Sequence, residues 1–453
     1  MPKHAALADR RLPPPRAVIV APRRSPDGPP RWLRRLVFWV ALLVLVASVP
    51  LLARLGYRTA IAAEGKIANA AAQDPSAPGY RAVVTPTPTM LVVHRGPEGQ
   101  LGSISLLAVA GDSGGGAVLL VPSGVLADLD SARPRTLAAI YRDEGVAGMQ
   151  AAVGRMFRIG FQSVVTADAR DWVTAAQSAA PLSLNNPDDV LDTDGEIIFG
   201  SGPRSLTAAQ VEPFLRLRNP GEDERGQLYR AQLLWRAWMD SRRQRPASGG
   251  EAGLAALIAD LGRGPVEVLP LPVQVADAAT LARVDVTAPQ ATTATVGAEG
   301  GGTDSGGTDT TLEGAGNVFV VDLAAVRSLV ASLVPFPSSS QPGDRVRVRL
   351  LDGLGDAAQA INVSSLLVPA GAEITVFGNA DHFEYPSSVV EYYDQAQAAN
   401  AQALAAALGL ASATFNPAGD ATVDVSVIVG RDLARQGVPA KVTMPSVVAS
   451  SGG

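Results

Sequence analysis

TMLVVHR (residues 89–95), ISLLAVAG (104–111) and AVLLVPSG (117–124) are runs of apolar, β-branched residues that follow one another closely. Such runs, bounded by Gly and polar residues, predict buried strands. DSGGG (112–116), between the second and third runs, has the glycine content of a hairpin turn. These segments place a β-sheet at the start of an ordered region.

Helical patterns follow these strands. GVAGMQAAVGRMFRIG (145–160) has apolar residues at helical spacing, FQSVVTAD (161–168) is typical of a buried strand, and DARDWVTAAQSAA (168–180) begins with Asp and continues as a helix. Strands interleaved with helices predict an α/β domain, which we place at residues 88–285. Residues 286–315 are rich in Gly and Thr and are expected to be a disordered, low-complexity insertion.

Order resumes with a strand, a helix and a linker over residues 316–342. Residues 343–435 then give the order strand, helix, strand, strand, helix, strand, and this βαββαβ pattern predicts a second, smaller α/β domain. We expect residues 436–453 to be a disordered tail.

The N-terminal part indicates a membrane anchor. LVFWVALLVLVASVPLLA (36–53) has eighteen residues without a charge, enough to span most of a bilayer core, so we predict a transmembrane helix over 36–55. Arginine-rich segments precede it, which predicts a disordered cytoplasmic leader (1–35) and an extracytoplasmic remainder that begins with a stalk at 56–87. A cleaved signal peptide is the alternative interpretation.

Composition and motifs exclude several functions. The net charge of −5 argues against a general nucleic-acid-binding protein, and the absence of cysteine excludes disulfides and thiolate metal sites. The sequence has neither a Walker A motif nor a glycine-rich dinucleotide motif after a strand. His4, His94 and His382 stand alone, which predicts structural or solvated roles, and Ser123 lacks the context of a hydrolase nucleophile.

FLRLRNPGEDERGQLYRAQ (214–232) contains four arginines: Arg216, Arg218, Arg225 and Arg230. Guanidinium groups bind phosphate oxygens in a bidentate manner, so several that converge suit a diphosphate. Arg230 and Gln232 lie near the start of a helix, where anions are favoured. Spacing leaves a second interpretation open, a charged turn in which Glu222, Asp223 and Glu224 neutralise the arginines.

This stretch resembles the core motif of the LytR-CpsA-Psr family, Y-x-R-x-R followed by D-x-G-R-x-x-R-Q-Q. The corresponding segments are residues 214–218 and 224–232. The final ninety or so residues, with RVRVRLLDGLG and GNADHFEYPSSVVEYY, are similar to the LytR C-terminal domain. The resemblance implies a membrane-anchored α/β/α domain with a tunnel for a polyprenyl chain and arginines that hold its pyrophosphate.

Family members transfer glycopolymers from the lipid carrier to peptidoglycan, so polyprenyl-linked glycopolymer, peptidoglycan and the membrane are the partners that the resemblance implies. Arg216, Arg218, Arg230 and Gln232 are the pyrophosphate-binding residues that it implies. It also implies Mg²⁺ or a similar ion held by Asp, but Ser103 stands at that position. Ser123 and Gly124 replace an Arg and an Asp, and Gln227 replaces a second Arg.

These replacements remove the metal carboxylates and two cations, so we expect lipid-pyrophosphate binding with weak or absent catalysis. Two other hypotheses remain: an active glycopolymer transferase with an altered site, and a non-catalytic envelope scaffold or wall-binding protein without a lipid-pyrophosphate site. A transcriptional attenuator is disfavoured because no DNA-binding motif is present.

Overall fold

A computed structural model describes residues 74–111, 114–129, 131–192, 194–246, 251–284, 317–419, 422–436 and 447–449. The chain divides into two compact units, Met1–Asn69 and Ala70–Gly453, and all described residues belong to the second. The predicted leader, transmembrane helix and insertion lie outside the described residues, as does most of the predicted tail. Within the described part of the chain, no helix is long and apolar enough to cross a membrane.

The first domain is built on a five-stranded sheet in the order β10-β4-β3-β2-β5. The strands are β2 (Thr89–Arg95), β3 (Leu101–Val109), β4 (Gly116–Val121), β5 (Ser163–Ala167) and β10 (Val266–Pro270). β3 is antiparallel to both β2 and β4, while β5 and β10 are parallel to their neighbours. Therefore β2, β4, β5 and β10 all have their carboxyl ends at the same edge of the sheet.

Both faces of this sheet are buried, which explains the continuous apolar runs in the sequence. In β2, Met90 and Val92 face one core, and Leu91 and Val93 face the other. β3 and β4 alternate in the same way because successive side chains point to opposite faces of a strand. The sheet therefore forms the middle layer of the domain.

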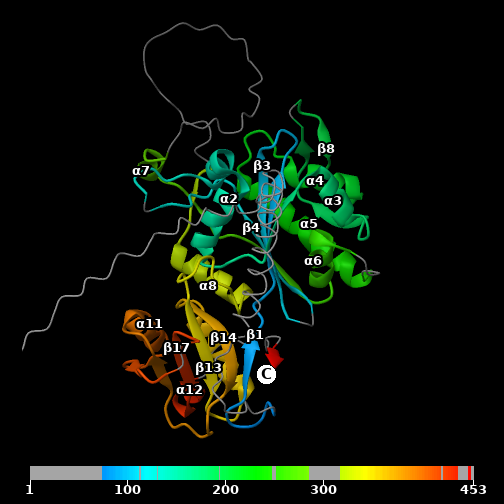
Figure 1. The fold of residues 1–453 in the computed structure, drawn as a ribbon. Coiled ribbons are helices and arrows are strands. Elements are labelled where there is room, and N and C mark those ends of the chain that lie inside the picture. The colour runs from blue at the N-terminus through cyan, green and yellow to red at the C-terminus, as the bar shows by residue number, and fades with distance from the viewer. Residues whose placement is uncertain are drawn as a thin grey trace, which may run out of the picture. The chain divides into compact units, whose positions relative to one another are not determined.

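Helices cover each face (Figure 1). One layer contains α3 (Ala169–Ala176), α4 (Ala208–Arg216), α5 (Glu224–Gln244) and α6 (Gly253–Leu261), and the other contains α2 (Leu137–Phe157) and α8 (Leu323–Leu333). Val326 and Val330 of α8 belong to the second core, so the segment that follows the predicted insertion completes the α/β/α domain.

Shorter elements complete this domain. They are the pairs β6 (Leu182–Asn186) with β9 (Gly202–Leu206), β7 (Val190–Leu191) with β8 (Ile197–Phe199), and β11 (Gln274–Val275) with β12 (Phe319–Val320), and the helix α7 (Ala278–Leu281). The helix starts follow from the local sequence, since Asp168 caps α3 in a capping box and Asp223 caps α5.

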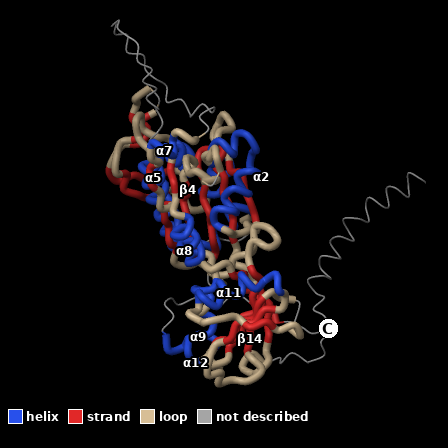
Figure 2. The backbone as a smooth tube through the Cα atoms, turned by 90° about the vertical axis from the view of Figure 1, so that its left-hand side faces the viewer, coloured by secondary structure: helices blue, strands red, loops and turns tan. Residues whose placement is uncertain are grey.

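The second domain has the predicted βαββαβ order. Its elements are β13 (Val346–Asp352), α9 (Ala357–Asn362), α10 (Ser364–Leu367), β14 (Ala372–Asn379), β15 (Val389–Tyr392), η2 (Gln395–Gln397), α11 (Ala398–Ala407), β16 (Thr414–Phe415), β17 (Val425–Val429) and α12 (Arg431–Gln436). Helices α9 and α11 contribute to a core with the strands, and Figure 2 shows them beside the red strands. The mixed α/β class predicted from the sequence is therefore observed.

Two strands of this second sheet come from segments in which the sequence indicated no fold. β1 (Arg81–Val84), within the predicted stalk, pairs antiparallel with β14, and β18 (Val447–Ala449), within the predicted tail, pairs with β1. The sheet order is β16-β15-β17-β13-β14-β1-β18. A strand of three or four residues is too short to show an alternating apolar pattern in the sequence. Here hydrogen bonds to a strand far away in the sequence determine the extended conformation.

Candidate functional site at the carboxyl edge of the sheet

Several of the residues that the family resemblance singled out lie at the edge where β2 and β4 end. His94 lies at the end of β2, and its register partner Ser103 lies at the start of β3. Ser123 and Gly124 follow β4 directly. Ligands of open α/β sheets bind outside the carboxyl ends of the strands, so this edge is the candidate site.

Arg216 and Arg218 approach this edge from the end of α4. Arg216 is the last residue of the helix, and the helix stops because Leu217 is extended, with φ −66° and ψ 140°. The side chain of Gln227 in α5 donates to the carbonyl oxygens of Leu215 and Arg216 over 2.7 and 3.1 Å. These bonds satisfy acceptors that a helix end leaves unpaired, and they fix the backbone that carries both arginines.

Arg216 connects the surface to a buried histidine. Its Nε donates to Glu212 Oε1 over 2.9 Å, and His94 Nε2 lies 3.1 Å from the same oxygen. Burial would raise the pKa of Glu212, but the hydrogen bond from His94 and the charge of Arg216 outweigh it and hold the pKa below its ordinary value. Because an ionised carboxylate only accepts, His94 Nε2 carries the hydrogen. About a third of the Arg216 side chain is exposed, at 32%.

Arg218 belongs to a second network. Its Nη1 donates to Asn317 Oδ1 over 3.0 Å, and the same oxygen accepts the backbone N–H of Glu224 over 3.1 Å. Asn317 follows the predicted insertion, so the segments on both sides of α5 meet at Arg218. The arginine itself is half-buried.

The Glu224 carboxylate is buried beneath Arg218. Oε1 accepts from the backbone N–H of Ser123 over 2.5 Å, and Oε2 accepts from that of Gly124 over 3.0 Å. Burial raises the pKa of Glu224, and the two amide hydrogen bonds and the charge of Arg218 oppose the rise only in part. The loop after β4 and the start of α5 are therefore joined through one carboxylate.

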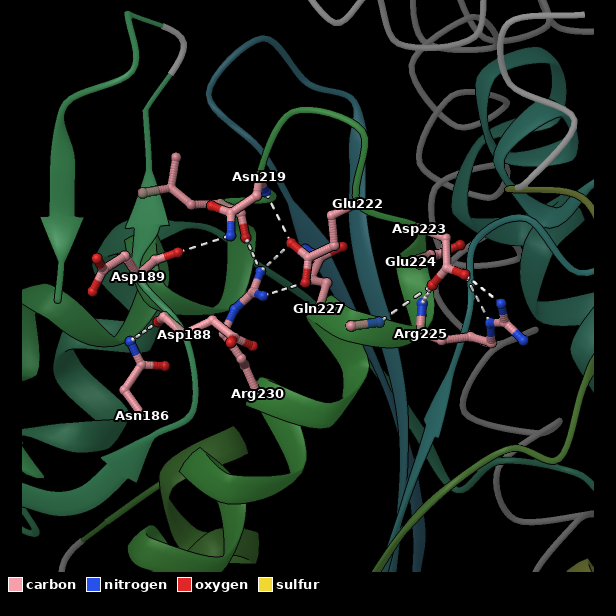
Figure 3. A network of polar contacts seen from close by, with 12 residues as sticks. Asn186, Asp188, Asp189, Asn219, Glu222, Asp223, Glu224, Arg225, Gln227 and Arg230 are labelled. Carbon is pink, nitrogen blue, oxygen red and sulfur yellow. Dashed lines mark hydrogen bonds and ion pairs between the residues drawn. The ribbon is translucent and has the colours of Figure 1, made fainter. Parts of the chain in front are cut away.

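Arg230 and Gln232 form hydrogen bonds inside the domain. Arg230 is 1% exposed, forms an ion pair with Glu222 and donates from Nη2 to the Leu217 carbonyl over 3.0 Å (Figure 3). Gln232 donates to the Val268 carbonyl of β10 over 2.6 Å. Both side chains are thus engaged by the protein, and Arg230 helps Gln227 to hold the end of α4.

The remaining arginine of the stretch, Arg225, is on the surface. It forms an ion pair with Asp223, and 53% of its side chain is exposed. Figure 3 shows this pair apart from the group formed by Arg230, Glu222 and Asn219. Three of the four arginines therefore have an acidic partner in contact, and the fourth, Arg218, has Asn317 in contact and Glu224 nearby.

Gly124 explains one departure from the family pattern. A Cβ at this position would lie 1.8 Å from the backbone oxygen of Asn317, so a larger residue does not fit. The carboxylate that the resemblance implies at this position has no room here. Among the described residues, no group of three His, Cys, Asp or Glu side chains could hold a metal ion, and the side chains at this edge do not suit the implied Mg²⁺.

Large side chains fill the space behind His94. The Trp172 ring lies 5.7 Å from the imidazole, and Trp235 and Trp238 are stacked at 5.3 Å next to it. All three indoles are at most 1% exposed. The layer between the sheet and the helices α3 and α5 is filled by these rings, whereas the family resemblance implies a tunnel in this domain.

Sequence reasoning missed Glu212, Glu224 and Asn317 as parts of the site and treated His94 as solitary. The spacing of Glu212 and Arg216, four residues apart on a helix, was the available signal for one pair. The position of His94, two residues after Val92 on the same face of β2, was the signal for its burial. The contacts with Ser123 and Asn317 join segments about a hundred residues apart and have no local signal.

A comparison with known protein families agrees with the C-terminal part of the resemblance. Residues 345–433 match the family model described as LytR cell envelope-related transcriptional attenuator. Among curated proteins, no match was found.

Solved structures with a similar fold include TagT of B. subtilis, at 14% identity and a TM-score of 0.38, covering 60% of this chain and 96% of that one. A second TagT structure, with bound octaprenyl pyrophosphate lipid, has 14% identity and a TM-score of 0.37, with 60% and 98% coverage. A LytR-Csp2A-Psr enzyme from Actinomyces oris has 17% identity and a TM-score of 0.33, covering 43% of this chain and 85% of that one. Residues 345–433 thus match the LytR C-terminal domain model, and the matched part of the chain is similar to LytR-CpsA-Psr proteins.

Proposed function

We propose that the protein acts in cell-wall glycopolymer attachment as a membrane-anchored binding protein for polyprenyl-pyrophosphate-linked glycan, with weak or absent catalysis. The LytR C-terminal domain supports a role in the cell envelope. One observation carries the ligand assignment: Arg216 and Arg218 lie at the carboxyl edge of the sheet, together with the residues that correspond to the family's phosphate and metal positions.

Arg216 and Arg218 are the contact residues in this proposal. Glu212 binds the Nε of Arg216, and a guanidinium has further N–H donors with which it can bind phosphate oxygens. Arg230 and Gln232 support the site from within, because their polar atoms bond to Glu222, Leu217 and Val268. In this proposal they position the site, in place of the direct contact with pyrophosphate that the resemblance implies.

The proposal of weak or absent catalysis rests on the side chains present. A transfer reaction at pyrophosphate needs positive charge on the leaving group, which a metal ion or several cations supply. At this edge the acidic side chains are Glu212 and Glu224, and each is already bound to protein donors.

An envelope scaffold without a lipid-pyrophosphate site is the second candidate. It is favoured by the internal ion pairs of Arg216, Arg225 and Arg230, which reduce the positive charge available to a ligand.

The test measures binding of undecaprenyl pyrophosphate to the full-length protein in detergent and, separately, Mg²⁺-dependent turnover of the lipid-linked substrate. We expect Arg218→Ala to weaken binding at least tenfold, as the loss of a charge-assisted hydrogen bond would. Arg225→Ala removes the same charge from the exposed pair and is expected to bind as the wild type does. Equal effects of the two variants would favour the scaffold, and turnover that Arg218→Ala abolishes would establish an enzyme.

A further inference from the structure

The turn that follows β4 presents two successive backbone N–H groups to one carboxylate. Ser123 and Gly124 donate to the two oxygens of Glu224, over 2.5 and 3.0 Å. Adjacent backbone amides that point into one concavity form a common binding site for phosphate oxygens. The two Glu224 oxygens therefore occupy positions that suit two oxygens of a phosphate group.

The surroundings of this carboxylate also favour an anion. Arg218 is the charged group that faces it, and Arg218 and the Glu224 backbone share the Asn317 oxygen. Ser123, Gly124 and Asn317 contribute no charge. The neighbouring Asp223 and Arg225 are paired with each other and are more exposed than Glu224.

Glu224 differs from the other acidic residues of the stretch. Glu212, Glu222 and Asp223 each contact a guanidinium directly, whereas the Glu224 carboxylate accepts hydrogen bonds from uncharged donors, the backbone amides of Ser123 and Gly124 and the Ser123 side chain. It is 3% exposed, and a buried charge without a contacting counter-ion is costly.

The helix does not need Glu224 as a cap. Asp223 already accepts from the N–H groups of Arg225 and Gly226 at the start of α5. The side chain of Glu224 can therefore leave its position without uncapping the helix.

We propose that the Ser123 and Gly124 amides and Arg218 form an anion-binding cradle that Glu224 fills from within, so that a phosphate group binds there only after displacing this side chain. The choice of ligand rests on the proposed function. Glu224 thereby lowers the affinity of the ligand-free protein for pyrophosphate. A ligand whose lipid or glycan part also binds the protein elsewhere gains enough binding energy to displace Glu224 from the cradle.

The test is the affinity of the full-length protein in detergent for inorganic pyrophosphate, measured by calorimetry. Glu224→Gln removes the charge and replaces one acceptor oxygen by an NH₂ group that repels the facing amide, so pyrophosphate should bind about tenfold more tightly. Asp223→Asn is the matched control, because it removes the same charge one residue away and Asn caps a helix as well as Asp does. Its affinity should change less than about twofold, since Arg225 is exposed and screened.

Equal gains in both variants would mean a general charge effect and would overturn the proposal, as would an unchanged affinity in Glu224→Gln. If Glu224→Gln loses its fold without anion, pyrophosphate should restore its far-UV circular dichroism while leaving the core variant Trp238→Ala unfolded. Failure to restore it would equally reject the cradle. Inorganic pyrophosphate carries no lipid, so this comparison stands even if the protein does not select polyprenyl pyrophosphate over polyprenol.

Discussion

At the scale of single residues, the arginine stretch combines two roles that its sequence does not separate. Arg230 and Gln227 hold carbonyl groups at the end of α4, while Arg216 and Arg218 lie at the sheet edge. The turn interpretation, in which acidic neighbours neutralise the arginines, describes Arg225 and Arg230 correctly. It does not describe Arg216, whose partner Glu212 lies one turn earlier in the same helix, α4.

Glu212 gives a prediction about pH. Its pKa is lowered in the folded protein, so its contribution to stability is present above the unfolded value of about 4.5 and is lost as the pH falls through the folded pKa. Glu212→Gln should therefore destabilise the protein by roughly 1–3 kcal/mol at pH 7, because Arg216 and His94 lose a charged acceptor. The difference from the wild type should shrink toward pH 3.

Denaturant unfolding at both pH values measures this difference. Glu98→Gln, at an exposed position of the β2–β3 turn, is the control and should change the free energy of unfolding little at either pH. A difference for Glu212→Gln that stays constant between pH 7 and pH 3 would show that the carboxylate charge is not what stabilises the pair.

At the scale of elements, the order of strands and helices was predictable because the core strands have both faces buried. Runs such as TMLVVHR and AVLLVPSG are apolar throughout, and the helices that cover them begin at visible caps such as Asp168. β1 and β18 were not predictable, because distant strands supply their hydrogen bonds. The same reason applies to Asn317, which reaches the site from beyond the predicted insertion.

The substitution Gly124→Ala tests the close packing of the turn after β4. Gly124→Ala should destabilise the first domain by roughly 1–3 kcal/mol, because its Cβ would meet the Asn317 backbone and push the two segments apart. The same change should disturb the amide cradle. Gly96→Ala is the control, since its Cβ would meet only the flexible end of the exposed Gln100 side chain. Thermal unfolding of both variants measures the effect, and equal melting temperatures would contradict the close approach.

At the scale of the whole described unit, one buried arginine contacts both domains. Arg345 donates to the carbonyl oxygens of Val368 and Ala372, each over 2.9 Å, and from Nε to the carbonyl of Arg158 at the end of α2. Burial lowers the pKa of Arg345 to about 10, which still leaves it charged at neutral pH. The guanidinium is therefore a structural cation that satisfies three carbonyl groups.

Arg345→Met should lower the free energy of unfolding by roughly 1–3 kcal/mol, because it leaves those carbonyls without a donor. Arg347→Met, two residues later in β13, removes a half-exposed ion pair with Asp424 and should cost at most about 1 kcal/mol. Denaturant unfolding that shows the reverse order would contradict the role assigned to Arg345.

The central claim is that the carboxyl edge of the first sheet recognises the pyrophosphate of a lipid-linked glycan. The most direct measurement compares the affinity of the wild-type protein for undecaprenyl pyrophosphate with its affinity for undecaprenol in the same detergent. The account predicts that the pyrophosphate form binds at least tenfold more tightly, and that Arg218→Ala removes this preference. Equal affinities of the wild type for the two lipids would contradict it.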